Sequence, residues 1–230
     1  MELLLIRHAQ PAWVTDGVAF NDPGLTELGH AQAAALATHL AGTEIAELHV
    51  SSAVRSRETA APVAERLGLE PAVHEPLFEL RLPPDLDGSP VDAVRERFAG
   101  MRWRPREEWW AGLPGGGEPF GDFHERVTGH VEALLAERGA ERDPSDPQHV
   151  WQLADAEDVR RFAFVTHAGT TSVIVSHLLG IDPTPWEWER FSSNHAAVSV
   201  LRTTRISSGW IWSLQHFSDV SFLPPEMVTD

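Results

Sequence analysis

Short apolar runs recur along the chain, and polar side chains follow directly after them. The first run, from Leu3 to Ile6, ends at Arg7 and His8, and Pro11 comes soon after. Periodicity alone does not separate so short a run from one turn of a buried helix, but its length and the proline favour a strand. Further extended segments are expected at Ala46–Val50, Ala72–Leu80 and Arg161–Thr166. Because ligands bind beyond the carboxyl ends of strands in open α/β sheets, the polar residues at these ends are candidates for chemistry.

Helical patterns lie between these strands. The expected helices are Leu25–Ala41, Val54–Leu67, Phe120–Arg138 and Ala168–Leu179, with a shorter one from about Pro90 to Gly100, and two closing strands are expected at Ala197–Thr204 and Trp210–Phe217. Thr26 is a suitable N-cap for the first helix, and Gly68 a suitable stop for the second. The alternation predicts an α/β fold, a three-layer α/β/α sandwich with a mostly parallel central sheet. The length of 230 residues suits a single domain, 1–230.

Two segments depart from this alternation. Residues 83–119 are rich in proline and tryptophan and contain Gly115-Gly116-Gly117, so we expect a lid-like insertion over the strand ends. Its tryptophans could wall a pocket, although packing within the insertion is the more common role. Residues 139–158 are polar and rich in Asp and Pro, which predicts a surface loop insertion with one short helix around Trp151.

Polar residues at the strand ends form a candidate anion site. His8 follows the first strand, and His167 follows the strand Arg161–Thr166 at the start of a helix, where free backbone N–H groups favour an anion. Arg7 and Arg55 could converge there, because the planar guanidinium group binds phosphate oxygens in a bidentate manner. Residues two apart on a helix point in different directions, so at most one of Arg55 and Arg57 can face this edge.

Composition narrows the chemistry. The net charge of −16 argues against nucleic acid or an anionic membrane as a partner. All 18 basic residues are arginine and there is no cysteine, which excludes a Schiff-base lysine, a cysteine nucleophile and a thiolate metal site. The motif His-Glu-x-x-His is also absent, so we expect neither a metal nor another cofactor. The apolar stretch at the N-terminus is too short for a signal peptide or a membrane span and has no basic flank in front of it, and the lack of cysteine suits the cytoplasm.

Several motifs, taken in order, resemble those of the histidine phosphatase superfamily, the phosphoglycerate-mutase-like group. The matching stretches are Leu5-Ile6-Arg7-His8-Ala9-Gln10, Asp22 to Gly29, Ser51 to Ala60, Leu77-Phe78-Glu79, Gly116-Gly117-Glu118 and Thr166-His167-Ala168-Gly169. Each motif is weak by itself, but their order and spacing along most of the chain are specific.

The resemblance implies roles for individual residues. His8 would be the nucleophile that forms a phosphohistidine, while Arg7, Arg55 and His167 would hold the phosphoryl oxygens. Glu79 would be the proton donor, and Glu75 and Glu118 are alternatives for that acid. Gln10, Thr26, Glu118 and Ala168 are candidate substrate-binding residues, and Asn194 and His195, ahead of a strand, could either approach the site or form a turn.

The function that this resemblance implies is metal-independent hydrolysis of a small phosphorylated metabolite, by a histidine acid phosphatase-like phosphomonoesterase working through a phosphohistidine on His8. One alternative is phosphoryl transfer of the phosphoglycerate mutase type. Another is a protein that binds phosphorylated ligands without catalysis. The sequence identifies neither the substrate nor the oligomeric state, for which a homodimer is one candidate.

Overall fold

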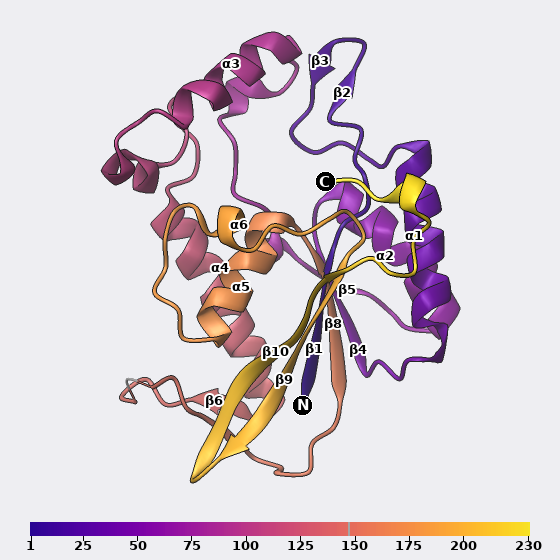
Figure 1. Cartoon of the computed structure of the whole chain (residues 1–230), viewed down its shortest axis with the longest axis vertical. Helices are drawn as coiled ribbons and strands as arrows, with labels where there is room; N and C mark the ends of the chain where they lie inside the picture. The colour runs from indigo at the N-terminus through magenta and orange to yellow at the C-terminus, as the bar shows by residue number, and fades with distance from the viewer. Residues whose placement is uncertain (147) are drawn as a thin grey trace.

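Strand β1 (Glu2–Arg7) lies in the middle of an eight-stranded sheet in the computed structural model, which describes residues 1–146 and 148–230 (Figure 1). The strand order is β5-β4-β8-β1-β9-β10-β7-β6. The other strands are β4 (Glu47–Ser51), β5 (Ala72–His74), β6 (Ala140–Arg142), β7 (Trp151–Leu153), β8 (Arg161–Thr166), β9 (Val198–Ile206) and β10 (Gly209–Asp219). The four strands from β5 to β1 pair in parallel, and the remaining pairings are antiparallel. The expected parallel core is confirmed, within a larger mixed sheet.

Helices cover both faces of this sheet (Figure 1). They are α1 (Glu27–His39), α2 (Val54–Leu67), α3 (Val91–Met101), α4 (Phe120–Glu137), α5 (Ala168–Leu178) and α6 (Glu187–Arg190). Alternate side chains of β1 point to opposite faces: Leu3 and Leu5 pack with α4 and α5, whereas Leu4 and Ile6 pack with α1 and α2. Both clusters exclude water almost completely, so the predicted three-layer α/β/α sandwich is confirmed.

The ends of the helices agree closely with the sequence expectation. The Thr26 hydroxyl accepts the Gly29 N–H at 2.9 Å and caps α1. Gly68 ends α2 in the left-handed conformation, with φ of +67°, which glycine adopts without the strain of a side chain. Among the described residues, no helix is long and apolar enough to cross a membrane.

Two local expectations are wrong. The short helix expected around Trp151 is instead strand β7, which pairs with β6 and extends the sheet. Trp151 is fully buried against Trp212 of β10, with ring centroids 6.0 Å apart, so its apolar surface packs within the sheet layer and not on a surface helix. The extended segment expected at 72–80 also stops at His74, because the 3-10 helix η2 (Glu75–Leu77) follows it.

Residues 83–119 lie at the end of the sheet where the parallel strands finish, and they contain α3 and the 3-10 helix η4 (Arg106–Ala111) (Figure 1). This segment is attached to a small hairpin, β2 (Val14–Thr15) and β3 (Val18–Ala19), through backbone hydrogen bonds at Ser89 and Val91. None of the residues of α3 is fully buried. The hairpin and α3 therefore stand together above the strand ends as one exposed unit.

Candidate active site

The two histidines singled out from the sequence lie side by side. Arg7 and Thr166 are register partners in the parallel pair β1–β8, so the residues that follow them, His8 and His167, emerge at the same edge. Their ring centroids are 5.1 Å apart in an edge-on arrangement. Both side chains are almost fully buried, at 3% and 0% exposure. The sheet register thus builds an imidazole pair at the floor of the site.

His8 is held with one ring nitrogen directed away from the protein's own hydrogen-bonding groups. Its Nδ1 lies 2.8 Å from the Ala9 carbonyl oxygen, and because a carbonyl only accepts, Nδ1 carries the hydrogen. The lone pair is then on Nε2, which has no hydrogen bond to any described residue. Burial, followed by the charges of Arg55 and Arg7, lowers the pKa of His8 well below its usual value. His8 is therefore a neutral imidazole with a free Nε2.

His167 presents the complementary arrangement. Its Nε2 lies 2.8 Å from the Ser51 hydroxyl, which also accepts the Ala53 N–H at 3.4 Å. When Ser51 donates its proton to Nε2, the hydrogen of His167 is on Nδ1, a buried nitrogen that has no partner within the described chain. Burial, together with Arg55 and His8, lowers the pKa of His167 well below its usual value. A neutral His167 thus offers one N–H donor.

Arg55 is a buried cation at the first turn of α2. It is 1% exposed, its Nη1 donates to Asp22 Oδ1 at 3.2 Å, and its guanidinium lies 4.6 Å from the ring centroid of Trp13. Burial lowers its pKa to about 10, against the opposing charges of Glu79 and Asp22, so it stays protonated near neutral pH. Arg57 lies on the exposed side of the helix, as the two-residue spacing indicated.

Arg7 is fixed by residues near the end of the chain. It donates to the Ser193 carbonyl oxygen and, at 3.0 Å, to Nε2 of His195. Since arginine only donates, Nδ1 of His195 carries the hydrogen and donates to Thr229 Oγ1 at 3.0 Å. The ring of His195 lies 5.7 Å from that of His8, so His195 belongs to the site. The sequence left its role open; its position ahead of β9, the neighbour of β1, was the available signal.

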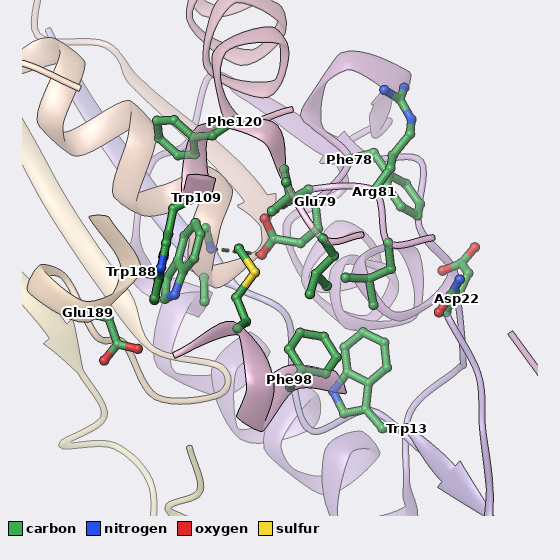
Figure 2. Close-up of a pocket in the computed structure, with 18 of the residues that line it drawn as sticks. Trp13, Asp22, Phe78, Glu79, Arg81, Phe98, Trp109, Phe120, Trp188 and Glu189 are labelled. Atoms are coloured by element: carbon green, nitrogen blue, oxygen red, sulfur yellow. Dashed lines mark hydrogen bonds between the residues drawn. The ribbon is translucent and has the colours of Figure 1, made fainter. Parts of the chain in front are cut away.

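Glu79 reaches the same place from the segment after η2. Its Oε2 accepts the Gly169 N–H at 2.8 Å, and its Oε1 accepts the Leu80 N–H at 3.0 Å (Figure 2). A Cβ at position 169 would lie only 2.5 Å from Glu79 Oε1, so any other residue there would displace the carboxylate from this position. Glu79 lines a cavity together with Arg7 and Arg55. A carboxyl group therefore stands opposite the cations.

The alternative acids are placed differently. Glu118 is engaged with Arg126 at 2.7 Å and with Arg81 at 2.9 Å, and burial, which raises its pKa, is outweighed by these partners, which lower it. Glu75 forms an exposed ion pair with Arg81. In the part of the chain that the structure describes, Glu79 alone of these three carboxylates lines the cavity. The geometry favours Glu79 as the acid.

The candidate substrate-binding residues divide in the same way. Ala168 lines the cavity. Gln10 and Thr26 are hydrogen-bonded to each other at 2.7 Å, and neither they nor Glu118 are among the described residues that line it. Thr26 and Gln10 instead fix the start of α1 beneath the site. Within residues 1–146 and 148–230, no cluster of three His, Asp or Glu side chains has the geometry of a metal site.

Arg126 of α4, which the sequence gave no reason to select, holds the segment that carries Glu79. Its Nη1 donates to the carbonyl oxygens of Pro76 and Phe78 at 2.8 and 2.9 Å, and its Nε and Nη2 donate to the two carboxylate oxygens of the nearly buried Glu118. The Glu79 carboxylate is thereby positioned through its backbone.

If Glu79 is the acid in hydrolysis of a phosphate ester, we expect Arg126→Met to lower kcat for phosphate release by about ten- to hundredfold. The reason is that displacement of a catalytic group, here the Glu79 carboxyl, by about an ångström has effects of that size. It should also destabilise the protein, since the nearly buried Glu118 would lose one of its two arginine partners and keep only Arg81. The double variant Arg126→Met/Glu118→Gln should recover stability in urea unfolding but not kcat. Recovery of both would contradict a positioning role for Arg126.

Buried histidines also predict how stability depends on pH. Burial, with Arg138, lowers the pKa of His49 to about 4, and burial, with Arg7, lowers that of His195 to about 3. Between those values and about 6.5 the unfolded chain binds protons that the folded chain does not, so the free energy of unfolding should fall as the pH falls. Glu187 acts in the opposite sense, because burial raises its pKa to about 7 and the folded state keeps its proton.

Urea unfolding at pH 7, 6 and 5 measures the balance between these two effects. Because the buried histidines outnumber Glu187, the free energy of unfolding of the wild-type protein should fall as the pH falls. His49→Gln should flatten the profile by about 1.4 kcal/mol per pH unit, the contribution of one titrating group, and Glu187→Gln should steepen it. Equal stability of the wild-type protein at the three pH values would contradict the buried neutral state of these histidines.

Known proteins share both the sequence pattern and the fold. The sequence profile of the histidine phosphatase superfamily (branch 1) matches residues 3–143. A glucosyl-3-phosphoglycerate phosphatase of Mycobacterium tuberculosis is 28% identical over 232 residues, covering 95% of this chain and 97% of that protein. A 2,3-bisphosphoglycerate-dependent phosphoglycerate mutase of Bartonella quintana is 31% identical over 131 residues, 54% of this chain, and the match spans only 64% of the mutase.

A solved structure agrees with these sequence matches. That of a mycobacterial glucosyl-3-phosphoglycerate phosphatase in complex with VO3 superposes with a TM-score of 0.71 at 26% identity, and the match covers 94% of this chain and 98% of that one. The imidazole pair at the ends of β1 and β8 lies within this shared fold. The sequence profile, the fold and the motifs agree: this chain belongs to the histidine phosphatase superfamily.

Proposed function

We propose that this protein is a phosphomonoesterase that transfers the phosphoryl group of its substrate to Nε2 of His8 and then to water, without a metal ion. The observation that carries the proposal is the free Nε2 of a neutral His8, fixed through Nδ1 beside the buried Arg55 and the partly buried Arg7. A neutral imidazole oriented in this way is an activated nucleophile.

In the first step, the Nε2 lone pair attacks phosphorus and the bond from phosphorus to the ester oxygen breaks. Arg7, Arg55 and the Nδ1–H of His167 stabilise the negative charge on the phosphoryl oxygens. The protonated carboxyl of Glu79 donates its proton to the departing oxygen, which leaves as an alcohol. The product of this step is a phosphohistidine opposite a Glu79 carboxylate.

In the second step, the Glu79 carboxylate takes a proton from water while the water oxygen attacks phosphorus. The bond from Nε2 to phosphorus breaks, inorganic phosphate leaves, and the neutral His8 and protonated Glu79 are restored. Each group thus returns to its starting state, and Glu79 acts once as acid and once as base. We place the reaction in the cytoplasm, because a chain without cysteine suits a reducing compartment.

Phosphate release from an aryl phosphate in the presence of a chelator tests this function. We expect turnover with excess EDTA and competitive inhibition by vanadate, an analogue of the five-coordinate phosphoryl group. Vanadate binding without turnover would identify a phospholigand-binding protein instead. Faster isomerisation of a phosphoglycerate than hydrolysis, in a coupled assay, would identify a mutase.

A further inference from the structure

The site opens into a cavity that is far larger than a phosphate group needs. Its volume is about 1170 Å³, beyond the ~300–1000 Å³ typical of small-molecule pockets. Arg7, Arg55, Glu79 and Gly169 are among the residues that line it, and Arg7 directly precedes His8 at the end of β1. Most of the space therefore surrounds whatever alcohol the phosphate is attached to.

Aromatic side chains form two walls of this space. Trp13, from the loop after β1, and Phe98, from α3, lie on one side of Glu79, whereas Trp109, from η4, and Trp188, from α6, lie on another (Figure 2). Trp13 and Phe98 are 37% and 42% exposed, which is high for large apolar side chains. Contiguous exposed apolar surface in a cleft marks a binding site for apolar groups.

The aromatic wall is continuous with the phosphate end. The ring of Trp13 lies over the guanidinium of Arg55, with 4.6 Å between the guanidinium carbon and the ring centroid. A group bonded to a phosphate at Arg55 would accordingly meet Trp13 first. On the other side, the ring of Trp188 lies tilted against that of Phe120, with ring centroids 6.2 Å apart, and Trp109 packs edge-on against Trp186, also at 6.2 Å. Trp13 is thus held against a guanidinium, and the wall of Trp109 and Trp188 is held by neighbouring rings.

Charge excludes a second anionic group from the outer part. Apart from Arg7 and Arg55, the arginines among the described lining residues are Arg81, paired with Glu75 and Glu118, and Arg102, paired with Glu189 at 3.7 Å. A carboxylate on the substrate would therefore find no arginine there that is not already paired with an acidic side chain. The lining also carries the acidic residues Asp22, which pairs with Arg55, and Glu189, which pairs with Arg102, as well as Asp87 and Asp230. A carboxylate or second phosphate on the substrate would meet repulsion.

From these observations we infer the substrate class, an inference that rests on the proposed function: a phosphate monoester of a bulky aromatic or similarly apolar alcohol that carries no further anionic group. Phosphoglycerates, which occur in the names of the relatives, place a carboxylate next to the phosphate and lack an apolar body. The aromatic walls and the paired arginines favour the opposite combination.

Two matched pairs of substrates test this inference. Phenyl and 2-naphthyl phosphate have similar leaving groups but differ by one ring, and we expect kcat/KM to be about tenfold or more higher for the naphthyl ester, from burial of the additional ring. Glycerol 3-phosphate and 3-phosphoglycerate differ by one carboxylate, and kcat/KM should be lower for the phosphoglycerate. Equal values for the aryl pair, or a preference for 3-phosphoglycerate, would overturn the inference.

Variants connect these preferences to the walls. Phe98→Ala should bring the naphthyl-to-phenyl ratio toward one, whereas Trp103→Ala, on the same segment but 90% exposed and outside the lining, should leave it unchanged. Glu189→Gln should release Arg102 and raise the ratio of 3-phosphoglycerate to glycerol 3-phosphate. Unchanged ratios in Phe98→Ala and Glu189→Gln would refute the assigned walls. Absence of phosphate release from all four esters would instead refute the proposed phosphatase activity.

Discussion

Replacement of His8 by alanine is expected to lower kcat for phosphate release by about 10⁴-fold or more, the scale seen when a covalent nucleophile is removed. The structure contains no ready substitute among its described residues. Nε2 of His167 is bonded to Ser51, and both ring nitrogens of His195 are occupied by Arg7 and Thr229. Steady-state release of phosphate from an aryl ester, with enzyme concentrations high enough to detect slow turnover, measures the loss.

The matched control is His216→Ala, which removes an exposed imidazole on β10. It should retain wild-type kcat and wild-type unfolding. His8→Ala itself should remain folded, because the deleted ring makes one hydrogen bond within the described chain, which its Nδ1–H donates to the Ala9 carbonyl oxygen. If folded His8→Ala kept more than about a tenth of the wild-type kcat, its activation free energy would have risen by less than ~1.4 kcal/mol. His8 would then not be the nucleophile.

Replacement of Glu79 by glutamine is expected to lower kcat by about 10²–10⁴-fold, the range for loss of a general acid or base. The amide oxygen can still accept the Gly169 N–H, and the Leu80 N–H loses its acceptor, so one of the two backbone contacts is kept while proton transfer is lost. The loss should depend on the leaving group in the first step. It should be largest for an alkyl phosphate, whose alkoxide needs the proton, and smaller for 4-nitrophenyl phosphate, whose phenolate does not.

Glu75→Gln is the control for this comparison, because Glu75 forms an exposed ion pair away from the cavity and should lose little activity. Measuring kcat/KM for both esters with each variant separates the two carboxylates. A Glu79→Gln enzyme with an equal loss on both esters would not support proton donation by Glu79. A leaving-group-dependent loss in Glu75→Gln would transfer the role to that residue.

The sequence predicted the part of the site that follows from strand register. Apolar runs with polar ends place Arg7, His8 and His167 at one edge of a parallel sheet, and the structure has this arrangement. The helix with Arg55 facing inward and Arg57 outward follows from helical geometry. These features are local, since each depends on one strand or one helix and on the general rule for parallel sheets.

Features that depend on packing between distant segments were not predictable in the same way. Arg126 and His195 reach the site only because α4 and the end of the chain fold against it, and neither has a distinguishing local pattern. Gln10 and Glu118 were candidates because they lie close in sequence to motif residues, yet their side chains turn toward Thr26 and Arg126. Trp151 was misplaced because its burial beneath β10 comes from a long-range strand pairing.

Direct detection of a phosphohistidine tests the central claim most closely. The protein is mixed with a fast aryl phosphate, quenched in base, which preserves the bond from nitrogen to phosphorus, and digested with trypsin. Cleavage after Arg7 gives a peptide that starts at His8 and ends at Arg55 when cleavage is complete. We predict one acid-labile phosphoryl group on that peptide, located on His8 and absent from His8→Ala. Turnover with no phosphorylated peptide at any quench time, or with the phosphoryl group on His167, would contradict the proposed mechanism.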